Sequence, residues 1–292
     1  MDLKELVRNW NSNYGDRLPI SEDLLEHTFF ALPTSDRAIV ETEDMVALLR
    51  KDEDVTRIHL AAPQKGRSQV KVVGGCMNVA TQQAALWHSK KIVYGGGEKH
   101  IFPGVPINKD TEIWMKELKP ASADVHDFEG SLKELQAQGK DAKLTPNAQW
   151  RPANDKREEI QIIDFVRTEF AGRWLNEICE DSLRGFMDQY HGLFVGGEIK
   201  GYARMYGWRS DYWAPGVYFS GPGRGMAGIG PIGVAKHCRS QGVGKEMLYR
   251  SWDVLLSHGC QSVRVDWSLE IDFFTSVGLS VVQSYRPAYK SI

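Results

Sequence analysis

The most informative part of this chain is the stretch IGVAKHCRSQGVGK, which spans residues 232–245. Its apolar start predicts a strand that ends near Val234. From Val243 to about His258, apolar residues recur at a spacing near 3.6, which predicts an amphipathic helix. Between the two lies the pattern Arg-x-x-Gly-x-Gly. Residues 232–245 therefore predict a strand, a tight glycine-containing loop and a helix, in that order.

The loop has the features of a site for a pyrophosphate. Gly242 and Gly244 leave the first N–H groups of the helix unobstructed, so an anion can approach the backbone closely. The helix dipole favours a phosphate there by roughly 0.3–1 kcal/mol at an exposed site. Arg239 or Lys245 can add a charge-assisted contact. The alternative is that residues 239–244 are only a turn between a strand and a helix.

Two other nucleotide-binding patterns fit the residues less well. A P-loop requires GxxxxGK followed by Ser or Thr, but Gly244-Lys245 is followed by Glu246, and Arg239 occupies the position of the first glycine. A GxGxxG pattern occurs at positions 228, 230 and 233. That pattern should open a helix directly after a strand, whereas here the glycines at 242 and 244 would interrupt such a helix.

The surrounding sequence predicts an α/β domain with a mixed sheet. Helical spacing appears over 156–170 and 174–186, and a Gly196-Gly197 turn between apolar runs predicts a hairpin of strands 192–195 and 199–206. Further predicted elements are strands 227–234, 262–267 and 280–286 and a short helix over 272–277. Aromatic residues crowd the glycine-rich segment before the loop, where they either stack on a substrate or pack onto the sheet: Tyr206, Trp208, Tyr212, Trp213, Tyr218 and Phe219.

The N-terminal half repeats this order loosely. We expect helices over 22–32 and 109–118 and strands over 56–61, 70–79, 91–94 and 123–128. The polar, turn-rich segment that follows, with QAQGKD at 136–141 and TPN at 145–147, is the predicted boundary. The predicted domains are therefore residues 1–135 and 150–292, with a linker at 136–149.

Composition limits the class of protein. The 292 residues are 42% hydrophobic and 25% charged with a formal net charge of -2, so no basic surplus indicates nucleic-acid binding. No apolar run is long enough to span a bilayer, and the start MDLKE does not resemble a secretory signal. The four cysteines stand singly, which predicts neither a metal site nor a disulfide framework. We expect a cytoplasmic protein that binds neither nucleic acid nor membrane.

Three motifs together resemble the GNAT (Gcn5-related) N-acetyltransferase superfamily. They are Gly233-Val234, the loop RSQGVG at 239–244, and DFFTSVGL at 272–279, which is similar to the family's closing FY-x-x-x-GF motif. VDW at 265–267, FPGVP at 102–106 and DVHDF at 124–128 resemble bacterial and fungal tandem-GNAT proteins, some of whose relatives are fused to β-N-acetylglucosaminidases. The resemblance implies two tandem GNAT-like domains, each a mixed, splayed β-sheet flanked by helices.

The resemblance also implies where acetyl-CoA binds. In the family, the strand before the loop diverges from its neighbour, and the pantetheine pairs with the backbone groups that this exposes. The residues expected to bind the cofactor are Ile232, Gly233, Val234, Arg239, Ser240, Gln241, Gly242, Val243, Gly244, Lys245 and Phe274.

Two departures from the family pattern affect the chemistry. Phe274 stands where the family often has a tyrosine that protonates the leaving thiolate, and a phenyl ring has no proton to give. The acid is then Tyr285, Tyr289 or water, or the thiolate leaves unaided, since thiol pKa values are about 8–9. The N-terminal half, residues 1–135, has no Arg-x-x-Gly-x-Gly after its strands. We expect this degenerate domain to shape the substrate cleft or a homodimer rather than to catalyse.

The residues proposed for catalysis must act on an amine, which has to lose a proton before it attacks a thioester; a base that removes it contributes about 10²–10⁴-fold. Asp266 is the first candidate because it lies near the end of the strand next to the cofactor strand. Glu270 and Tyr285 are further candidates. The structural alternative is that Asp266 caps the next helix or binds loop backbone and that Glu270 lies in that helix's exposed first turn.

These features favour an acyltransferase that moves an acetyl group from acetyl-CoA to a small-molecule primary amine, with an amino sugar such as glucosamine suggested by the resemblance. Two alternatives remain open. A non-catalytic acyl-CoA-binding sensor is consistent with the missing tyrosine and the degenerate first half. A protein or histone acetyltransferase is neither supported nor excluded by the near-neutral charge.

Overall fold

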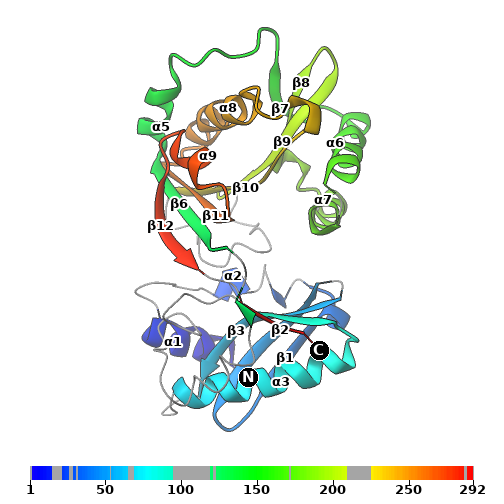
Figure 1. The fold of residues 1–292 in the computed structure, drawn as a ribbon, viewed down its shortest axis with the longest axis vertical. Coiled ribbons are helices and arrows are strands. Elements are labelled where there is room, and N and C mark those ends of the chain that lie inside the picture. Colours follow the sequence, from blue (N-terminus) through cyan, green and yellow to red (C-terminus); the bar gives the residue numbers. More distant parts are fainter. Residues whose placement is uncertain are drawn as a thin grey trace. The chain divides into compact units, whose positions relative to one another are not determined.

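The computed structural model describes residues 2–14, 22–25, 29–30, 32–52, 54–64, 69–94, 119–120, 123–170, 172–208, 225–285 and 288–291. The chain forms two compact units (Figure 1). One unit is built mainly from Met1–His126 and Gln283–Ile292, and the other mainly from Asp127–Trp213 and Pro222–Val282. Each has its own mixed sheet flanked by helices, as expected.

The first unit contains a sheet in the order β1-β2-β3-β4-β13-β5. β1 to β3 form an antiparallel meander, and β4 joins β3 in parallel. The core includes a continuous buried run from Met45 to Leu49. The elements are α1 (Leu3–Tyr14), α2 (Glu22–Leu25), η2 (Thr34–Asp36), β1 (Arg37–Glu41), β2 (Met45–Asp52), β3 (Val55–Pro63), α3 (Gln69–Leu86), β4 (Lys91–Tyr94), β5 (Lys119–Pro120) and β13 (Ala288–Ser291).

The strand predicted over residues 70–79 is wrong, because this segment lies in the helix α3. Its valines and paired glycines suggested a strand, but the residues that α3 buries follow a helical spacing: Cys76, Met77, Ala80 and Ala84. Small side chains let the helix lie close to the sheet, and tertiary packing overrides the strand preference of valine. The helix predicted over 109–118 lies outside the described residues.

The second unit contains a sheet in the order β12-β6-β11-β10-β9-β8-β7. The elements predicted for the C-terminal half are present in the predicted order. Their bounds are β6 (Val125–Ser131), α5 (Leu132–Gly139), β7 (Gln149–Pro152), α6 (Lys156–Glu169), α7 (Gly172–Arg184), η3 (Met187–Gln189), β8 (Tyr190–Val195), β9 (Glu198–Tyr206), β10 (Met226–Val234), η4 (Lys236–Cys238), α8 (Val243–Ser257), β11 (Ser262–Ser268), α9 (Ile271–Thr275) and β12 (Ser280–Tyr285).

Two strands are exchanged between the halves of the chain. β6, which precedes the predicted linker, lies between β11 and β12 in the second sheet. β13, at the C-terminal end, lies between β4 and β5 in the first sheet. The structure therefore divides the chain differently from the predicted boundaries 1–135, 136–149 and 150–292. Local polarity located a turn-rich segment, but strand pairing across the sequence determines which residues fold together.

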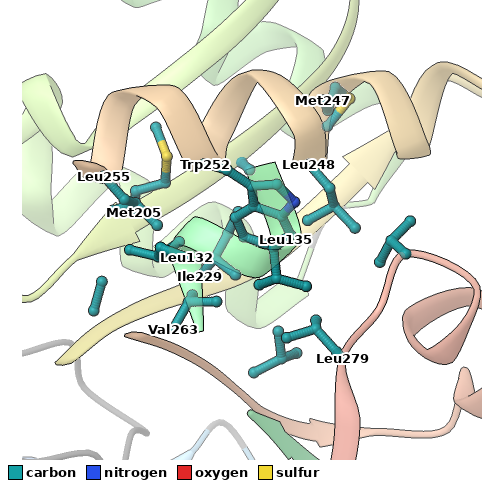
Figure 2. Close-up of a cluster of buried hydrophobic side chains, with 14 of the residues drawn as sticks. Leu132, Leu135, Met205, Ile229, Met247, Leu248, Trp252, Leu255, Val263 and Leu279 are labelled. Carbon is teal, nitrogen blue, oxygen red and sulfur yellow. The ribbon is translucent and has the colours of Figure 1, made fainter. Parts of the chain in front are cut away.

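The helices of the second unit cover both faces of its sheet, because side chains alternate between faces along a strand. On β9, Ala203 and Met205 pack with α8, whereas Tyr202 packs with α6 and α7; Figure 1 shows these helices on the two sides of the sheet. Figure 2 shows the core on the α8 side, where Leu132 and Leu135 of α5 lie beside Trp252 of α8. The predicted linker therefore begins inside a helix that contributes to the core.

Buried His191 makes the stability of the protein depend on pH. Desolvation, followed by the charge of His258, lowers the pKa of His191 from 6.5 to about 4. Between these values the unfolded chain binds a proton that the folded protein does not, so stability falls as the pH falls through this window. The whole loss is about 3 kcal/mol. Urea unfolding at pH 7 and at about pH 4.5 should show most of this loss of stability. His191→Gln should reduce the loss, and an equal loss in the variant would refute this origin.

Within the described residues, none of the helices combines the length and the apolar character needed to cross a membrane. Nor do these residues bring together three His, Cys, Asp or Glu side chains in a group that could hold a metal ion.

Candidate functional site

The site begins where two parallel strands separate. β10 pairs with β11 at Met226–Ser262, Ala227–Val263 and Gly228–Arg264. Beyond Gly228 the parallel register ends, although β10 continues to Val234 and β11 to Ser268. The sheet is therefore splayed on the side where both strands approach their carboxyl ends, as the resemblance to the GNAT superfamily implied for the strand before the loop.

A bulge in β10 accompanies the separation. The antiparallel register with β9 shifts between Ile229, opposite Met205, and Ile232, opposite Ala203. Three steps along β10 thus face two steps along β9, and the extra residue bends the strand and increases its twist. Gly230 lies in this bulge with a φ of 149°. The bend directs residues 229–234 away from β11.

This geometry also rejects the GxGxxG interpretation. The glycines at 228, 230 and 233 all lie within the strand β10 rather than in a turn that opens a helix. Two of them are required by close packing. A Cβ at position 228 would lie 1.9 Å from the Tyr206 ring, and a Cβ at position 233 would lie 2.4 Å from the Phe170 ring.

The loop after β10 adopts a conformation that exposes the start of α8. Ser240 and Gly242 have positive φ values of 60° and 85°, and Gly242 is the residue directly before the helix. Side chains within the loop support it: Arg239 Nε donates to the Val234 carbonyl over 3.2 Å, and Gln241 Nε2 donates to the His237 carbonyl over 2.7 Å. The first-turn N–H groups of an α-helix have no partner inside the helix, so they are available to an anion.

A cavity of about 790 Å³ occupies the gap between the strands. It lies within the second unit and brings the loop, the separated strands and the start of α9 together. Its lining comprises Phe170, Trp174, Ile229, Gly230, Pro231, Ile232, Gly233, Val234, Cys238, Arg239, Ser240, Gly242, Gly244, Lys245, Val265, Asp266, Ser268, Leu269, Glu270, Phe273 and Phe274. Most of the residues predicted for the site therefore meet at one cavity.

Three of the residues predicted for the site are not in the described lining of the cavity. Gln241 is exposed beside the loop, and Val243 packs against the hydrophobic core under α8; neither is in the described lining of the cavity. Tyr285 ends β12, and its side chain lies outside the described part of the structure, as does that of Tyr289. The roles of these residues stay predictions.

Asp266 lies at the wall of the cavity, on β11 beyond the point of separation. Its side chain is 10% exposed, and its Oδ1 is 3.3 Å from Nε of Arg264. The same guanidinium contacts Asp127 over 3.3 Å and Glu129 over 3.1 Å, both from β6. The carboxylate predicted as a base is thus one of three that share a single arginine.

Sequence reasoning missed Arg264, Asp127 and Glu129 as parts of the site. Positions two apart on a strand face the same side, so the pairs 127/129 and 264/266 each put two charges on one face of a strand. That pattern could have been noticed. That β6 and β11 are neighbours could not, because the two strands are far apart in the sequence and belong to different predicted domains.

Glu270 is exposed at the cavity and immediately precedes α9. Its backbone N–H donates to Ser268 Oγ over 3.1 Å, and its carbonyl accepts from the Phe274 N–H over 3.1 Å. Its backbone therefore shapes the start of α9, as the structural alternative proposed, while its side chain lies at the cavity.

Two phenylalanines close the cavity on the α9 side. Phe274 is 5% exposed and packs against the Phe128 ring at 5.0 Å. Phe273 lies beside the first turn of α8, where a Cβ added to Gly244 would be 3.1 Å from its ring. The ring of Phe274 lines the site without offering a proton, so this wall supplies shape and not acid catalysis.

The opposite wall carries Phe170 and Trp174, whose rings are 4.9 Å apart and which sequence reasoning did not assign to the site. They come from the end of α6 and the start of α7. Glu169, next to Phe170, accepts the Lys236 N–H over 3.0 Å and so ties this wall to the loop.

A buried ionic network fixes α7 against the sheet. Arg204 of β9 contacts Asp181 of α7 over 2.7 Å, and the Tyr190 hydroxyl donates to Asp181 over 2.7 Å. Burial raises the pKa of the Asp181 carboxyl against the opposing effect of the Arg204 charge. A buried pair of this kind costs stability when one partner is removed, so it holds α7, and with it Trp174, in place.

The aromatic segment before the loop is only partly described. Tyr206 is buried, and the Trp208 ring stacks on His258 with centroids 4.5 Å apart. These two residues pack onto the domain. The other aromatic residues of that segment, Tyr212, Trp213, Tyr218 and Phe219, lie outside the described residues.

Comparison with known proteins agrees with the geometry. Residues 156–274 match the family model of the acetyltransferase (GNAT) family. No curated protein matches the sequence significantly.

Several solved structures share the fold. A GCN5-related glucosamine N-acetyltransferase region of a fungal multi-domain GH3 β-N-acetylglucosaminidase is 18% identical with a TM-score of 0.76; the match covers 99% of this chain and 37% of that one. A GCN5-related N-acetyltransferase from Sphaerobacter thermophilus is 12% identical with a TM-score of 0.67, covering 99% and 91%. A tandem GNAT protein from the clavulanic acid biosynthesis pathway is 11% identical with a TM-score of 0.67, covering 99% and 95%. The predicted tandem fold is thereby confirmed.

Proposed function

We propose that the protein is an acetyl-CoA-dependent N-acetyltransferase, because residues 156–274 match the family model of the acetyltransferase (GNAT) family. The proposed acceptor is a small-molecule primary amine, with an amino sugar such as glucosamine as the first candidate. The similarity to the glucosamine N-acetyltransferase region of the fungal glycosidase supports this choice, as does the resemblance in sequence to tandem-GNAT proteins.

The observation that carries the proposal is the tip of α8 at the end of the splayed strands. Gly242 and Gly244 line a cavity of about 790 Å³ together with the diverging part of β10. Free N–H groups and the positive end of the helix dipole suit a pyrophosphate. Lys245 and Arg239 add positive charge at the same cavity. These residues fit the pyrophosphate of coenzyme A, and the edge of β10 from Ile232 to Val234, which lies beyond the pairing with β11, fits an extended pantetheine.

The reaction requires a base and a way to stabilise the acceptor. When bound, acetyl-CoA supplies the thioester carbonyl that the amine attacks. We expect Asp266 to take the proton that the acceptor ammonium must lose, because its carboxylate is at the cavity wall and beside the gap. Glu270 adds a second negative charge at the cavity, which attracts a cationic acceptor. Trp174 and Phe170 provide an apolar surface of the kind that packs against the face of a sugar.

Replacing Asp266 with asparagine tests the assignment of the base. The Asp266→Asn variant should lose about 10²–10⁴-fold in kcat, since general-base catalysis contributes that much, while its affinity for CoA stays the same. The measurement is thiol release from acetyl-CoA at saturating amine. Asp272→Asn is the matched control, because Asp272 is exposed on α9 and is not in the described lining of the cavity. A kcat equal to that of the control would remove Asp266 from the mechanism.

The same assay over a panel of amines distinguishes the functions. Turnover of glucosamine, with none of N-acetylglucosamine, whose amine is blocked, supports the amino-sugar acceptor. Turnover of lysine-containing peptides in preference to sugars would support a protein acetyltransferase. If CoA binds and none of the amines is acetylated, the protein is an acyl-CoA sensor, a function that Phe274 in place of the tyrosine would suit.

A further inference from the structure

The cavity wall that carries Asp266 is backed by a cluster of four charged side chains, which we call the Arg264 cluster. It consists of Arg264 and Asp266 on β11 and Asp127 and Glu129 on β6. The guanidinium contacts all three carboxylates, through Nη2 to Asp127, Nη1 to Glu129 and Nε to Asp266, at 3.1–3.3 Å. Asp127 is fully buried, and Asp266 and Arg264 are 10% and 11% exposed; only Glu129, at 32%, has much contact with solvent.

The composition of the Arg264 cluster is not what stability alone would require. One buried arginine needs one carboxylate to balance its charge, and even a balanced buried pair is often no more stable than apolar residues of the same size. Here three carboxylates converge on one guanidinium, so the formal charges of these four side chains sum to -2. Of the four residues of the cluster, only Asp266 is among the described residues that line the cavity. The negative charge is therefore placed directly behind the residue proposed as the base.

We propose that Asp127 and Glu129 are positioning residues that share the guanidinium of Arg264 with Asp266, and thereby hold the Asp266 carboxylate in place and preserve its ability to accept a proton. The inference rests on the proposed function for its catalytic meaning. It assigns to β6, a strand from before the predicted linker, a part in the chemistry of the C-terminal domain.

The physical reason is a competition for one positive charge. If Asp266 were paired with Arg264 alone, the arginine would stabilise the ionised carboxylate and make it a weak base. Two further carboxylates on the same guanidinium offset that effect by repelling negative charge at Asp266. A general base works best when its pKa lies near the operating pH. The two β6 residues therefore adjust Asp266 towards basicity, while the ion pair with the guanidinium keeps its carboxylate beside Arg264.

Besides Asp266, the described lining of the cavity carries charged groups of both signs. They are Glu270 before α9, Lys245 at the start of α8 and Arg239 in the loop. The Cys238 thiol is a further titratable group of the lining. The described lining residues of β10 and of α6 and α7 carry no charged side chain. The β6 carboxylates are thus the negative groups in contact with Arg264 itself.

The test is a direct titration of Asp266 in the full chain. Aspartate labelled with ¹³C at the carboxyl carbon gives a resonance for Asp266 that Asp266→Asn identifies by its loss. Glu129→Gln should lower the midpoint of this titration by about one pH unit, the low end of the effect of a nearby charge. Glu134→Gln, which removes the same charge from an exposed site on α5, should leave the midpoint unchanged.

Opposite substitutions should act in opposite directions. Arg264→Gln should raise the midpoint, because it removes the only positive charge of the cluster. If that variant does not fold, the comparison of Glu129→Gln with the wild-type protein still tests the proposal. If the midpoint in Glu129→Gln equals that of the wild-type protein, as is expected for the control Glu134→Gln, the proposal is overturned.

Kinetics give a second readout that a merely structural role would not move. In Glu129→Gln, the acidic limb of the kcat profile should shift to lower pH and the plateau should fall, with little change in KM for acetyl-CoA. A uniform loss at every pH would overturn the proposal. If the protein acetylates no amine at all, the proposed function fails, but the titration of Asp266 still supports or overturns the coupling of the Arg264 cluster.

Discussion

Replacing Gly244 with glutamate is expected to abolish the binding of coenzyme A. Gly244 lies in the first turn of α8 and lines the cavity. A Cβ there would be 3.1 Å from the Phe273 ring and 3.6 Å from Val234, so a longer side chain has to enter the space beside the helix tip. Its carboxylate would occupy the anion site and repel the pyrophosphate. The same carboxylate is favourable for the helix itself by roughly 0.3–1 kcal/mol, so the fold should persist.

Isothermal titration with CoA and thermal unfolding of each variant measure these two effects. Gly244→Gln adds the same bulk without the charge and separates crowding from repulsion; it should weaken binding less than the glutamate does. Gly244→Ala adds only the Cβ and should bind most nearly like the wild-type protein. Unchanged affinity for CoA in Gly244→Glu would refute the assignment of the helix tip as the pyrophosphate site.

The fragment of residues 150–292 is expected not to fold, although it contains the whole domain that the sequence predicted. It lacks β6 and α5, and with them three core side chains that are at most 1% exposed: Phe128, Leu132 and Leu135. Figure 2 shows the two leucines. Losing one such side chain from a core costs about 2–5 kcal/mol, and the total stability of a domain is about 5–15 kcal/mol. The fragment also leaves Arg264 without its buried partner Asp127.

A fragment of residues 123–285 is the matched comparison, because it retains every strand of the second sheet. It should give a cooperative thermal transition and dispersed amide resonances, whereas 150–292 should give neither. Equal thermal midpoints for the two fragments would show that β6 and α5 are dispensable, and would restore the boundary at residue 150.

Features that depend on neighbouring residues were predictable. The strand β10, the loop and α8 were expected within one residue of their observed ends because glycine conformation, apolar spacing and helix termini are local properties. The Gly196-Gly197 turn is observed with positive φ at both residues, which is why the hairpin β8–β9 could be predicted from two letters. The segment 69–86 misled because valine and glycine are local indicators of a strand, whereas its burial pattern is helical.

The sequence by itself established the tandem α/β organisation and the loop that faces the cavity, since each depends on the chemistry and spacing of residues close together in the chain. The tertiary structure alone revealed the exchange of β6 and β13, and with it the meeting of Asp127 and Glu129 with Arg264 behind Asp266. Strand pairing uses backbone hydrogen-bonding groups that almost every residue carries. Which distant strands become neighbours is therefore hard to predict from the sequence before the sheet is assembled.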